Sequence, residues 1–167
     1  LDDNLAQVLE SSCEKIMQRD ALMLESLLLE SLKVKQYYIE RDPKEQLGIR
    51  DALNLGHTFA HALETVGNLS QWAHGEAVAW GIAKALAAGK MLNVTPSSFA
   101  AKYIALLQRY GYKIDMRITQ MPEYLAALKS DKKKRNSQVR FVLMKGQGSH
   151  VLSPLPENLI MELVGPQ

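Results

Sequence analysis

Apolar residues recur at spacings of three and four along most of the chain, which is the period of an amphipathic α-helix. The stretch NLAQVLESSCEKIMQ, residues 4–18, is one example. Each segment of this kind buries one face and leaves the other to solvent. The period predicts helices over residues 4–18, 21–40, 52–66, 74–92, 96–110, 122–129 and 156–164.

Capping and breaking residues stand at the ends of these segments. Asp20 can accept hydrogen bonds at the start of the second helix. Thr95 can do the same before Pro96, which suits the first position of a helix. Pro43 breaks the second helix, and Gly67 suits a C-terminal cap on the third. The predicted helices are therefore separate elements joined by short connections.

The pattern changes near the C-terminus. Residues 137–153, SQVRFVLMKGQGSHVLS, contain two apolar runs around Lys145–Gly148, which predicts a β-hairpin. No glycine-rich loop follows a strand, so the chain shows no dinucleotide-binding βαβ unit. We therefore expect a mainly α, multihelical fold with one small β-hairpin, and we expect residues 1–167 to form a single domain.

Composition adds a few constraints. The net charge of the 167 residues is +2, which is too small to indicate a nucleic-acid or membrane partner. Cys13 is the single cysteine, so an internal disulfide is excluded and a reducing, cytoplasmic compartment is expected. No apolar run approaches the roughly 20 residues that span a bilayer.

Three of the four histidines lie in one stretch, LNLGHTFAHALETVGNLSQWAHGEAVAWG, residues 53–81. His57 and His61 are four residues apart, so a helix would place both on one face, which Glu64 continues. A turn after Gly67 would form a helical hairpin and bring His74 beside the other two. Imidazoles gathered in this way could bind one metal ion or one anion.

Catalytic zinc accepts two imidazoles and a carboxylate and leaves one position open for substrate. At a helix N-terminus His74 would stay neutral, as a metal ligand must. Thr58 stands where the zincin motif needs Glu after its first histidine, so a metalloprotease is not indicated. The alternative is a helical core with hydrogen-bonded histidines, and the pattern alone leaves both readings open.

A stripe of polar residues at spacings of four, three and four accompanies the histidines, and one helix would align its members. Such a stripe is costly to bury without partners. It suits an anionic, hydroxylated ligand, and a solvent-facing stripe is the alternative. Its members are Arg50, Asn54, His57 and His61.

Further polar candidates lie upstream and downstream. Lys35 and Glu45 precede the stripe. SDKKKRN, residues 130–136, is a basic run between a helix and the hairpin. A charge run of this kind is typical of a solvated loop, although one of its lysines could also reach a phosphate. No aromatic residues alternate with the charges, so a platform for nucleic-acid bases is not indicated.

The combination of motifs resembles a known family. LNLGHTFAHALE followed by HGEAVAWG is similar to the signature of the 3-dehydroquinate synthases. Upstream, Lys35, the acidic run 42–45, Arg50 and Asn54 resemble the pattern of that family, and so does the downstream DKK at 131–133. The similarity extends over most of the chain and implies the multihelical, metal- and substrate-binding C-terminal domain of such an enzyme.

The resemblance implies roles for the histidines that spacing alone does not give. His57 and His74 would be two ligands of a catalytic Zn²⁺ or Co²⁺. His61 would instead bind the phosphate end of the substrate and assist proton movement. Spacing alone would have paired His57 with His61 as the metal ligands.

The same resemblance implies the remaining site residues. Asn54 would bind the phosphate end, and either Lys132 or Lys133 would reach the phosphate. Lys35 and Arg50 would hold the carboxylate and hydroxyl region of the substrate. The matches depart from the family pattern at three places: an inserted residue between Glu45 and Arg50, another in the loop before His74, and Ala60 in place of Gly. The residues with implied catalytic roles are His61, Lys35, Arg50, Asn54 and Glu45.

In this family an N-terminal domain holds NAD, and a Glu before the present chain supplies the third zinc ligand. Leu1 opens directly on an amphipathic pattern, so we expect a fragment without that domain and without activity of its own. The resemblance implies a lyase of the shikimate pathway, which leads to chorismate and the aromatic amino acids, working in the cytoplasm as a homodimer. Its substrate would be the sugar-acid phosphate DAHP, and its products 3-dehydroquinate and phosphate.

Other functions remain open at this point. A different sugar phosphate cyclase, making an inosose or a valiolone, would share the fold and most of the site. Iron-dependent alcohol and glycerol dehydrogenases share the architecture but lack the polar stripe and the DKK motif. A non-catalytic helical interaction domain is the alternative of another class.

Overall fold

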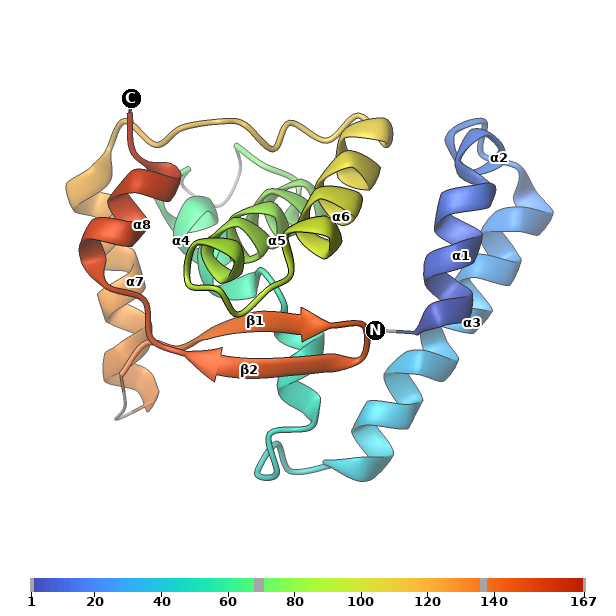
Figure 1. Ribbon diagram of the computed structural model, residues 1–167, viewed down its shortest axis with the longest axis horizontal. Helices are drawn as coiled ribbons and strands as arrows, with labels where there is room; N and C mark the ends of the chain where they lie inside the picture. Colours follow the sequence, from blue (N-terminus) through green and yellow to red (C-terminus); the bar gives the residue numbers. More distant parts are fainter. Residues whose placement is uncertain (1, 68–70, 136–137, 167) are drawn as a thin grey trace. The chain divides into compact units, whose positions relative to one another are not determined.

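The structure is a computed structural model in which residues 2–67, 71–135 and 138–166 are described. Helices and one two-stranded β-hairpin make up its regular elements (Figure 1), which confirms the predicted fold class. Contacts divide the chain into two compact units. Unit 1 is Leu1–Leu53 with Gln147–Ser149, and unit 2 is Asn54–Gly146 with His150–Gln167. That residues 1–167 form a single domain stays a prediction.

Unit 1 consists mainly of α1 (Asp3–Ser11), α2 (Cys13–Met17) and α3 (Ala21–Arg41). The predicted cap of α3 is confirmed, because the Asp20 carboxylate accepts a hydrogen bond from the Met23 N–H at 2.9 Å. The continuous helix predicted over residues 4–18 is interrupted at Ser12, where the backbone leaves helical geometry. Serine side chains compete for nearby backbone groups and so weaken a helix at such a point.

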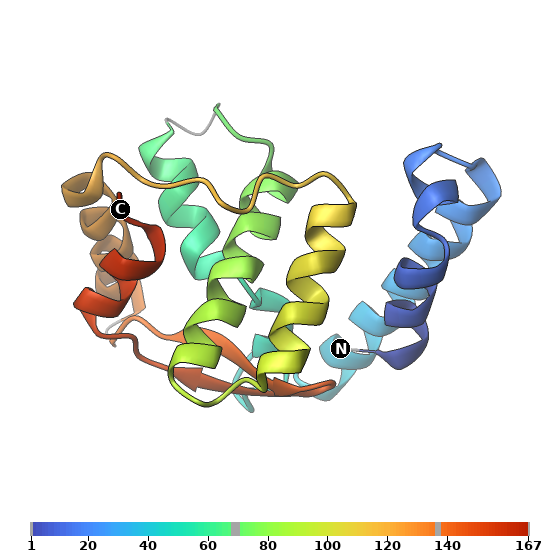
Figure 2. The same cartoon turned by 45° about the horizontal axis from the view of Figure 1, so that its top comes forward.

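Unit 2 is built around α5. This helix packs against α4, α6, α8 and β1, and α4 also packs against α7. Figure 2 shows α4, α5 and α6 side by side. The elements after unit 1 are the 3₁₀ helix η1 (Arg50–Asn54), α4 (His57–Val66), α5 (His74–Met91), α6 (Ser97–Arg109), α7 (Met121–Arg135), β1 (Phe141–Gly146), β2 (Ser149–Ser153) and α8 (Glu157–Val164).

An aromatic cluster joins the helices of unit 2. Phe59 of α4, Trp80 of α5, Tyr124 of α7 and Phe141 of β1 are all almost fully buried. Their polar atoms are satisfied: the Tyr124 hydroxyl donates to the Phe59 carbonyl at 3.2 Å, and the Trp80 indole N–H donates to the Met116 carbonyl at 3.0 Å. Burial of these large side chains fixes α4 against both α5 and α7.

The start of α4 differs from the prediction. One helix was expected over residues 52–66, but η1 ends at Asn54 and α4 begins at His57. Gly56 lies between them with a positive φ of 79°, a conformation that glycine adopts without steric cost. Arg50 and Asn54 are therefore not part of the α-helix that carries His57, and the predicted four-residue stripe on one helix is wrong.

Two other helix ends also differ. α6 begins at Ser97, and the Thr95 hydroxyl donates to the Met144 carbonyl instead of capping that helix. α7 continues to Arg135, so most of the basic run is helical rather than the predicted loop. Lysine and arginine are good helix formers, which accounts for the extension. Among the described residues, no helix is both long and apolar enough to cross a membrane.

Candidate metal and substrate site

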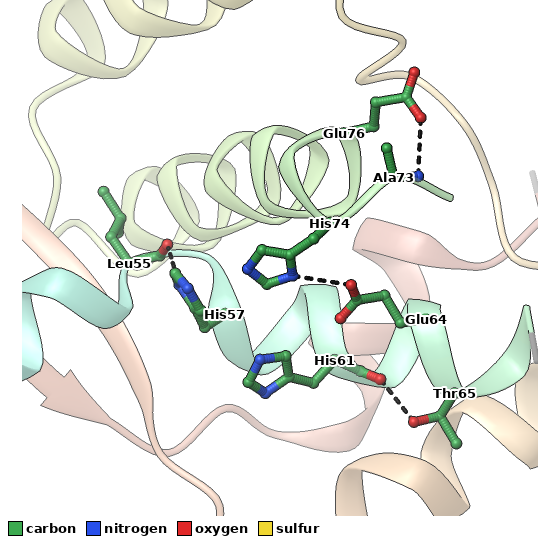
Figure 3. Close-up of polar contacts among 8 residues, drawn as sticks. All are labelled: Leu55, His57, His61, Glu64, Thr65, Ala73, His74 and Glu76. Carbon is green, nitrogen blue, oxygen red and sulfur yellow. Dashed lines mark hydrogen bonds and ion pairs between the residues drawn. The ribbon is translucent and has the colours of Figure 1, made fainter. Parts of the chain in front are cut away.

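Three imidazoles, two from α4 and one from the start of α5, meet between these helices (Figure 3). The ring centroid of His57 lies 5.6 Å from that of His61 and 5.6 Å from that of His74. The centroids of His61 and His74 are 6.2 Å apart. The predicted helical hairpin and the meeting of its three histidines are therefore confirmed.

Two glycines allow α4 and α5 to approach closely beside these rings. A Cβ atom on Gly81 would overlap the Gly56 carbonyl, and one on Gly56 would overlap the backbone of Gly81 and Ile82. The first turn of α4 therefore rests directly on the backbone of α5. This contact holds the α4 turn that carries His57 against α5.

His57 is the half-buried member of the cluster. Burial lowers the pKa of its imidazole, and the nearby rings of His61 and His74 act in the same direction. Its Nδ1 atom lies 3.3 Å from the Leu55 carbonyl, which can only accept a hydrogen bond. Burial favours the neutral ring, and in that ring the Leu55 contact places the proton on Nδ1 and the lone pair on Nε2.

His74 is the first residue of α5, as the sequence predicted. Its Nδ1 atom lies 2.9 Å from Oε1 of Glu64 on α4. Glu64 lies on the face of His57 and His61, as its spacing predicts. Its pairing with His74 has no counterpart in the sequence pattern. The pair joins the last turn of α4 to the start of α5.

The donor set fits a metal ion that takes imidazole nitrogen. Both His57 and His74 have Nδ1 close to an acceptor, so in each neutral ring Nε2 would be the nitrogen available to a metal ion. Within residues 2–67, 71–135 and 138–166, no three His, Cys, Asp or Glu side chains are grouped so that they could hold a metal ion. That His57 and His74 bind a metal ion stays a prediction.

A second polar group lies in unit 1, in the turn after α3. The buried Asp42 carboxylate accepts hydrogen bonds from the backbone N–H groups of Gln46, Leu47 and Arg50 at 2.8, 3.1 and 3.2 Å. Nε of Arg50 lies 3.1 Å from Oε1 of Glu45. The two predicted site residues Glu45 and Arg50 therefore form an ion pair on a turn that Asp42 organises.

The remaining predicted residues are placed on separate elements. Lys35 is exposed on α3 in unit 1, and Asn54 is half-buried at the end of η1 in unit 2. Lys132 and Lys133 belong to α7, but their side chains lie outside the described part of the structure. A common site for these residues and the imidazoles stays a prediction.

Comparison with known proteins places the chain in a family. The sequence model of the 3-dehydroquinate synthase C-terminal region matches residues 1–134. The chain belongs to the 3-dehydroquinate synthase family. The synthase of Dichelobacter nodosus is 35% identical over 159 residues, which are 93% of this chain and 42% of that protein. The synthase of Thermoanaerobacter pseudethanolicus is 29% identical over 98% of this chain and 46% of its own length.

Solved structures share the fold. A 2-epi-5-epi-valiolone synthase from Streptomyces hygroscopicus with bound NAD⁺ and Zn²⁺ superimposes with a TM-score of 0.81 at 18% identity, over 97% of this chain and 45% of that one. A 2-deoxy-scyllo-inosose synthase with carbaglucose-6-phosphate, NAD⁺ and Co²⁺ gives 0.70 at 23% identity, over 84% and 40%. The chain spans about half the length of the 3-dehydroquinate synthases that it matches.

Proposed function

We propose that this chain is the C-terminal, metal- and substrate-binding domain of a 3-dehydroquinate synthase, which converts DAHP into 3-dehydroquinate and phosphate. The observation that carries the proposal is the meeting of His57, His61 and His74, the three histidines of the family motif, in one cluster. The match of residues 1–134 to the family supports it.

His57 and His74 are the proposed metal ligands, each through Nε2. The lowered pKa of His57 keeps that ring neutral and able to bind a metal. A carboxylate from the rest of the protein completes the set in this proposal. The metal is zinc or cobalt, since solved enzymes of the same fold hold Zn²⁺ or Co²⁺.

NAD is the second proposed cofactor, bound mainly by an N-terminal domain. When bound, it supplies a hydride acceptor, while the metal polarises the substrate oxygen as a Lewis acid. The residues of this chain bind the substrate and orient it relative to the metal and NAD. Such positioning lowers the barrier of the reaction. His61, exposed beside the metal pair, moves a proton at the phosphate end of the substrate.

Charged residues hold the ends of the substrate in this proposal. Arg50 and Lys35 bind its carboxylate and hydroxyl region, because a guanidinium pairs with a carboxylate through two parallel hydrogen bonds. Glu45 orients Arg50 through the ion pair at 3.1 Å. The phosphate is held by Asn54 and by a lysine of α7, Lys132 or Lys133.

The proposed setting follows from the family. The enzyme is a lyase of the shikimate pathway that works in the cytoplasm as a homodimer. The isolated 167-residue chain is proposed to be inactive, because it would lack a hydride acceptor and a full ligand set. NAD-dependent turnover by the isolated chain at the rate of the full-length protein would contradict this.

The test is product analysis on the full-length protein with NAD, zinc and DAHP. We expect 3-dehydroquinate and one equivalent of phosphate. A His57→Ala variant is expected to lose bound zinc and turnover together, while His150→Ala, which changes a histidine outside the cluster, retains both. Zinc content and turnover unchanged in His57→Ala would show that His57 is not a metal ligand. A wild-type protein that binds no zinc and forms no product would favour a non-catalytic helical domain.

Another sugar phosphate cyclase is the second candidate. The fold similarity to a valiolone synthase, with a TM-score of 0.81, favours it. The same assay separates the two, because such an enzyme would act on a phosphorylated sugar instead of DAHP. Turnover of a phosphorylated sugar without a carboxylate, with none of DAHP, would replace the first proposal by the second.

A further inference from the structure

The contact between Glu64 and His74 is short and involves a mostly buried carboxylate. Oε1 of Glu64 lies 2.9 Å from Nδ1 of His74, and only 14% of the Glu64 side chain is exposed, against 60% for His74. Figure 3 shows the Glu64 carboxylate directed at the His74 ring, with His61 one turn earlier on α4. A mostly buried carboxylate aimed at one imidazole nitrogen restricts the orientation of that ring.

The chemistry of this contact fixes which nitrogen remains available. A carboxylate only accepts hydrogen bonds, so Nδ1 of His74 carries the proton and donates it. In the neutral ring, which metal binding requires, the lone pair of His74 is then on Nε2. His57 reaches the same state through the Leu55 carbonyl, but at a longer distance of 3.3 Å.

The two hydrogen-bond acceptors, the Leu55 carbonyl and the Glu64 carboxylate, differ in which part of the chain they connect to the ring. The Leu55 carbonyl is two residues from His57 on the same segment. Glu64 is ten residues from His74 and on another helix. The Glu64 contact therefore sets the orientation of His74 relative to α4, the helix that carries His57. Hydrogen bonds of this kind to metal-bound histidines raise the basicity of the ligand and hold its ring in place.

We propose that Glu64 is a positioning residue for the metal, which orients His74 so that Nε2 and the Nε2 of His57 bind the same ion. This inference rests on the proposed metal-binding function. Glu64 is not itself a ligand in this proposal, because its carboxylate is engaged with Nδ1 of His74. It acts on the metal only through that imidazole.

The experiment measures zinc affinity of the full-length protein by competition with a chelator. Glu64→Ala is expected to weaken zinc binding by about 10- to 100-fold, the range usual for such outer-shell partners. Glu64→Gln keeps an oxygen that accepts from Nδ1, so its affinity is expected to fall by less than about tenfold. Glu76→Gln is the matched control, because Glu76 is on α5 and its carboxylate accepts from the Ala73 N–H at 3.1 Å. Its affinity is expected to equal that of the wild type.

A cobalt-substituted protein gives a readout that a purely structural role would not change. The visible absorption bands of Co²⁺ report ligand geometry, so they are expected to shift in Glu64→Ala and to return close to the wild-type spectrum in Glu64→Gln. If Glu64→Ala does not fold, Glu64→Met takes its place, since methionine is similar in length to glutamine and accepts hydrogen bonds only weakly. A wild-type affinity and spectrum in Glu64→Ala or Glu64→Met would overturn the inference. Loss as large in Glu64→Gln as in Glu64→Ala would also overturn it, because it would point to a direct ligand.

His57→Ala and His74→Ala separate this inference from the proposed function. Both variants are expected to lose zinc binding. If they bind zinc as the wild type does, the proposed metal site itself is wrong. If they lose zinc while Glu64→Ala retains wild-type affinity, the metal site stands and only the role of Glu64 is wrong.

Discussion

Asp42 shows how one buried side chain can organise predicted site residues. Its carboxylate is 1% exposed and accepts from three backbone N–H groups of the turn that carries Glu45 and Arg50. Glu45 has a positive φ of 51°, which is an uncommon conformation for a residue with a side chain. The hydrogen bonds of Asp42 therefore stabilise a turn that the backbone of Glu45 would not favour by itself.

The pKa of Asp42 makes this role testable. Burial acts to raise the pKa, but the backbone N–H groups of Leu47, Gln46 and Arg50 outweigh it and hold the pKa below the ordinary value of 3.8. A carboxyl group with a lowered folded pKa stabilises the fold at pH values above its unfolded pKa. That contribution is lost as the pH falls through the lowered folded pKa.

We therefore expect Asp42→Asn to lower the urea midpoint of unfolding at pH 7. The difference from the wild type should narrow below pH 3.8, as the wild-type carboxyl takes up its proton. Glu14→Gln, which removes an exposed carboxylate of α2, should leave the midpoint near that of the wild type. A difference between Asp42→Asn and wild type that stays constant from pH 7 to pH 2.5 would contradict the role of Asp42.

At the residue level, the histidine cluster could be predicted from spacing. A spacing of four residues on one helix, followed by a turn, was enough to predict that His57, His61 and His74 meet. The contacts of Glu64 and Asp42 could not be predicted in the same way. Glu64 acts on the neighbouring helix and Asp42 on backbone N–H groups, and neither kind of partner leaves a periodic signal in the sequence.

At the level of elements, the contact between α4 and α5 depends on two glycines. Gly81 is within α5, where glycine costs about 1 kcal/mol relative to alanine in helix propensity. Its lack of a side chain is nonetheless required, because a Cβ there would overlap the Gly56 carbonyl. The close approach of the two helices outweighs the lower helix propensity.

Gly81→Ala is expected to destabilise the protein by about 1–3 kcal/mol, the usual range for an overpacked site. Gly75→Ala is the control, since a Cβ at Gly75 meets no atom within 4 Å and alanine favours a helix. Urea unfolding of both variants provides the measurement. Equal stabilities of Gly81→Ala and Gly75→Ala would show that the backbones can separate without cost.

Most helices and the hairpin could be predicted from the apolar period, but their ends could not. The period continues through residues 52–66, while the positive φ of Gly56 decides where α4 starts. Thr95 is a residue type that often caps helices, yet its hydroxyl donates a hydrogen bond to the Met144 carbonyl of β1. Helix ends depend on tertiary contacts that a local pattern does not contain.

At the level of the whole molecule, the chain carries two groups of candidate residues in two units. Lys35, Glu45 and Arg50 belong to unit 1, and Asn54 and the three imidazoles belong to unit 2. Contacts between residues far apart in sequence decide such a division, and helical periodicity does not report them. The proposal that both groups serve one substrate rests on the family motif.

The family match predicts how His57 and His74 bind a metal ion in the full-length protein. The chain covers 42% to 46% of the length of these 3-dehydroquinate synthase relatives. In the proposed site, His57 and His74 would supply two of the metal ligands. A complete zinc site would therefore combine residues of this chain with a carboxylate from the rest of the enzyme.

Anomalous scattering at the zinc absorption edge from crystals of the full-length protein tests this account most directly. We expect one zinc ion bonded to Nε2 of His57 and Nε2 of His74 at about 2.0–2.1 Å, with a carboxylate from outside this chain as the third protein ligand. Two results would contradict the account. One is a zinc ion bound elsewhere when the same protein preparation forms 3-dehydroquinate, and the other is a zinc ion bonded to Nδ1 of either ring.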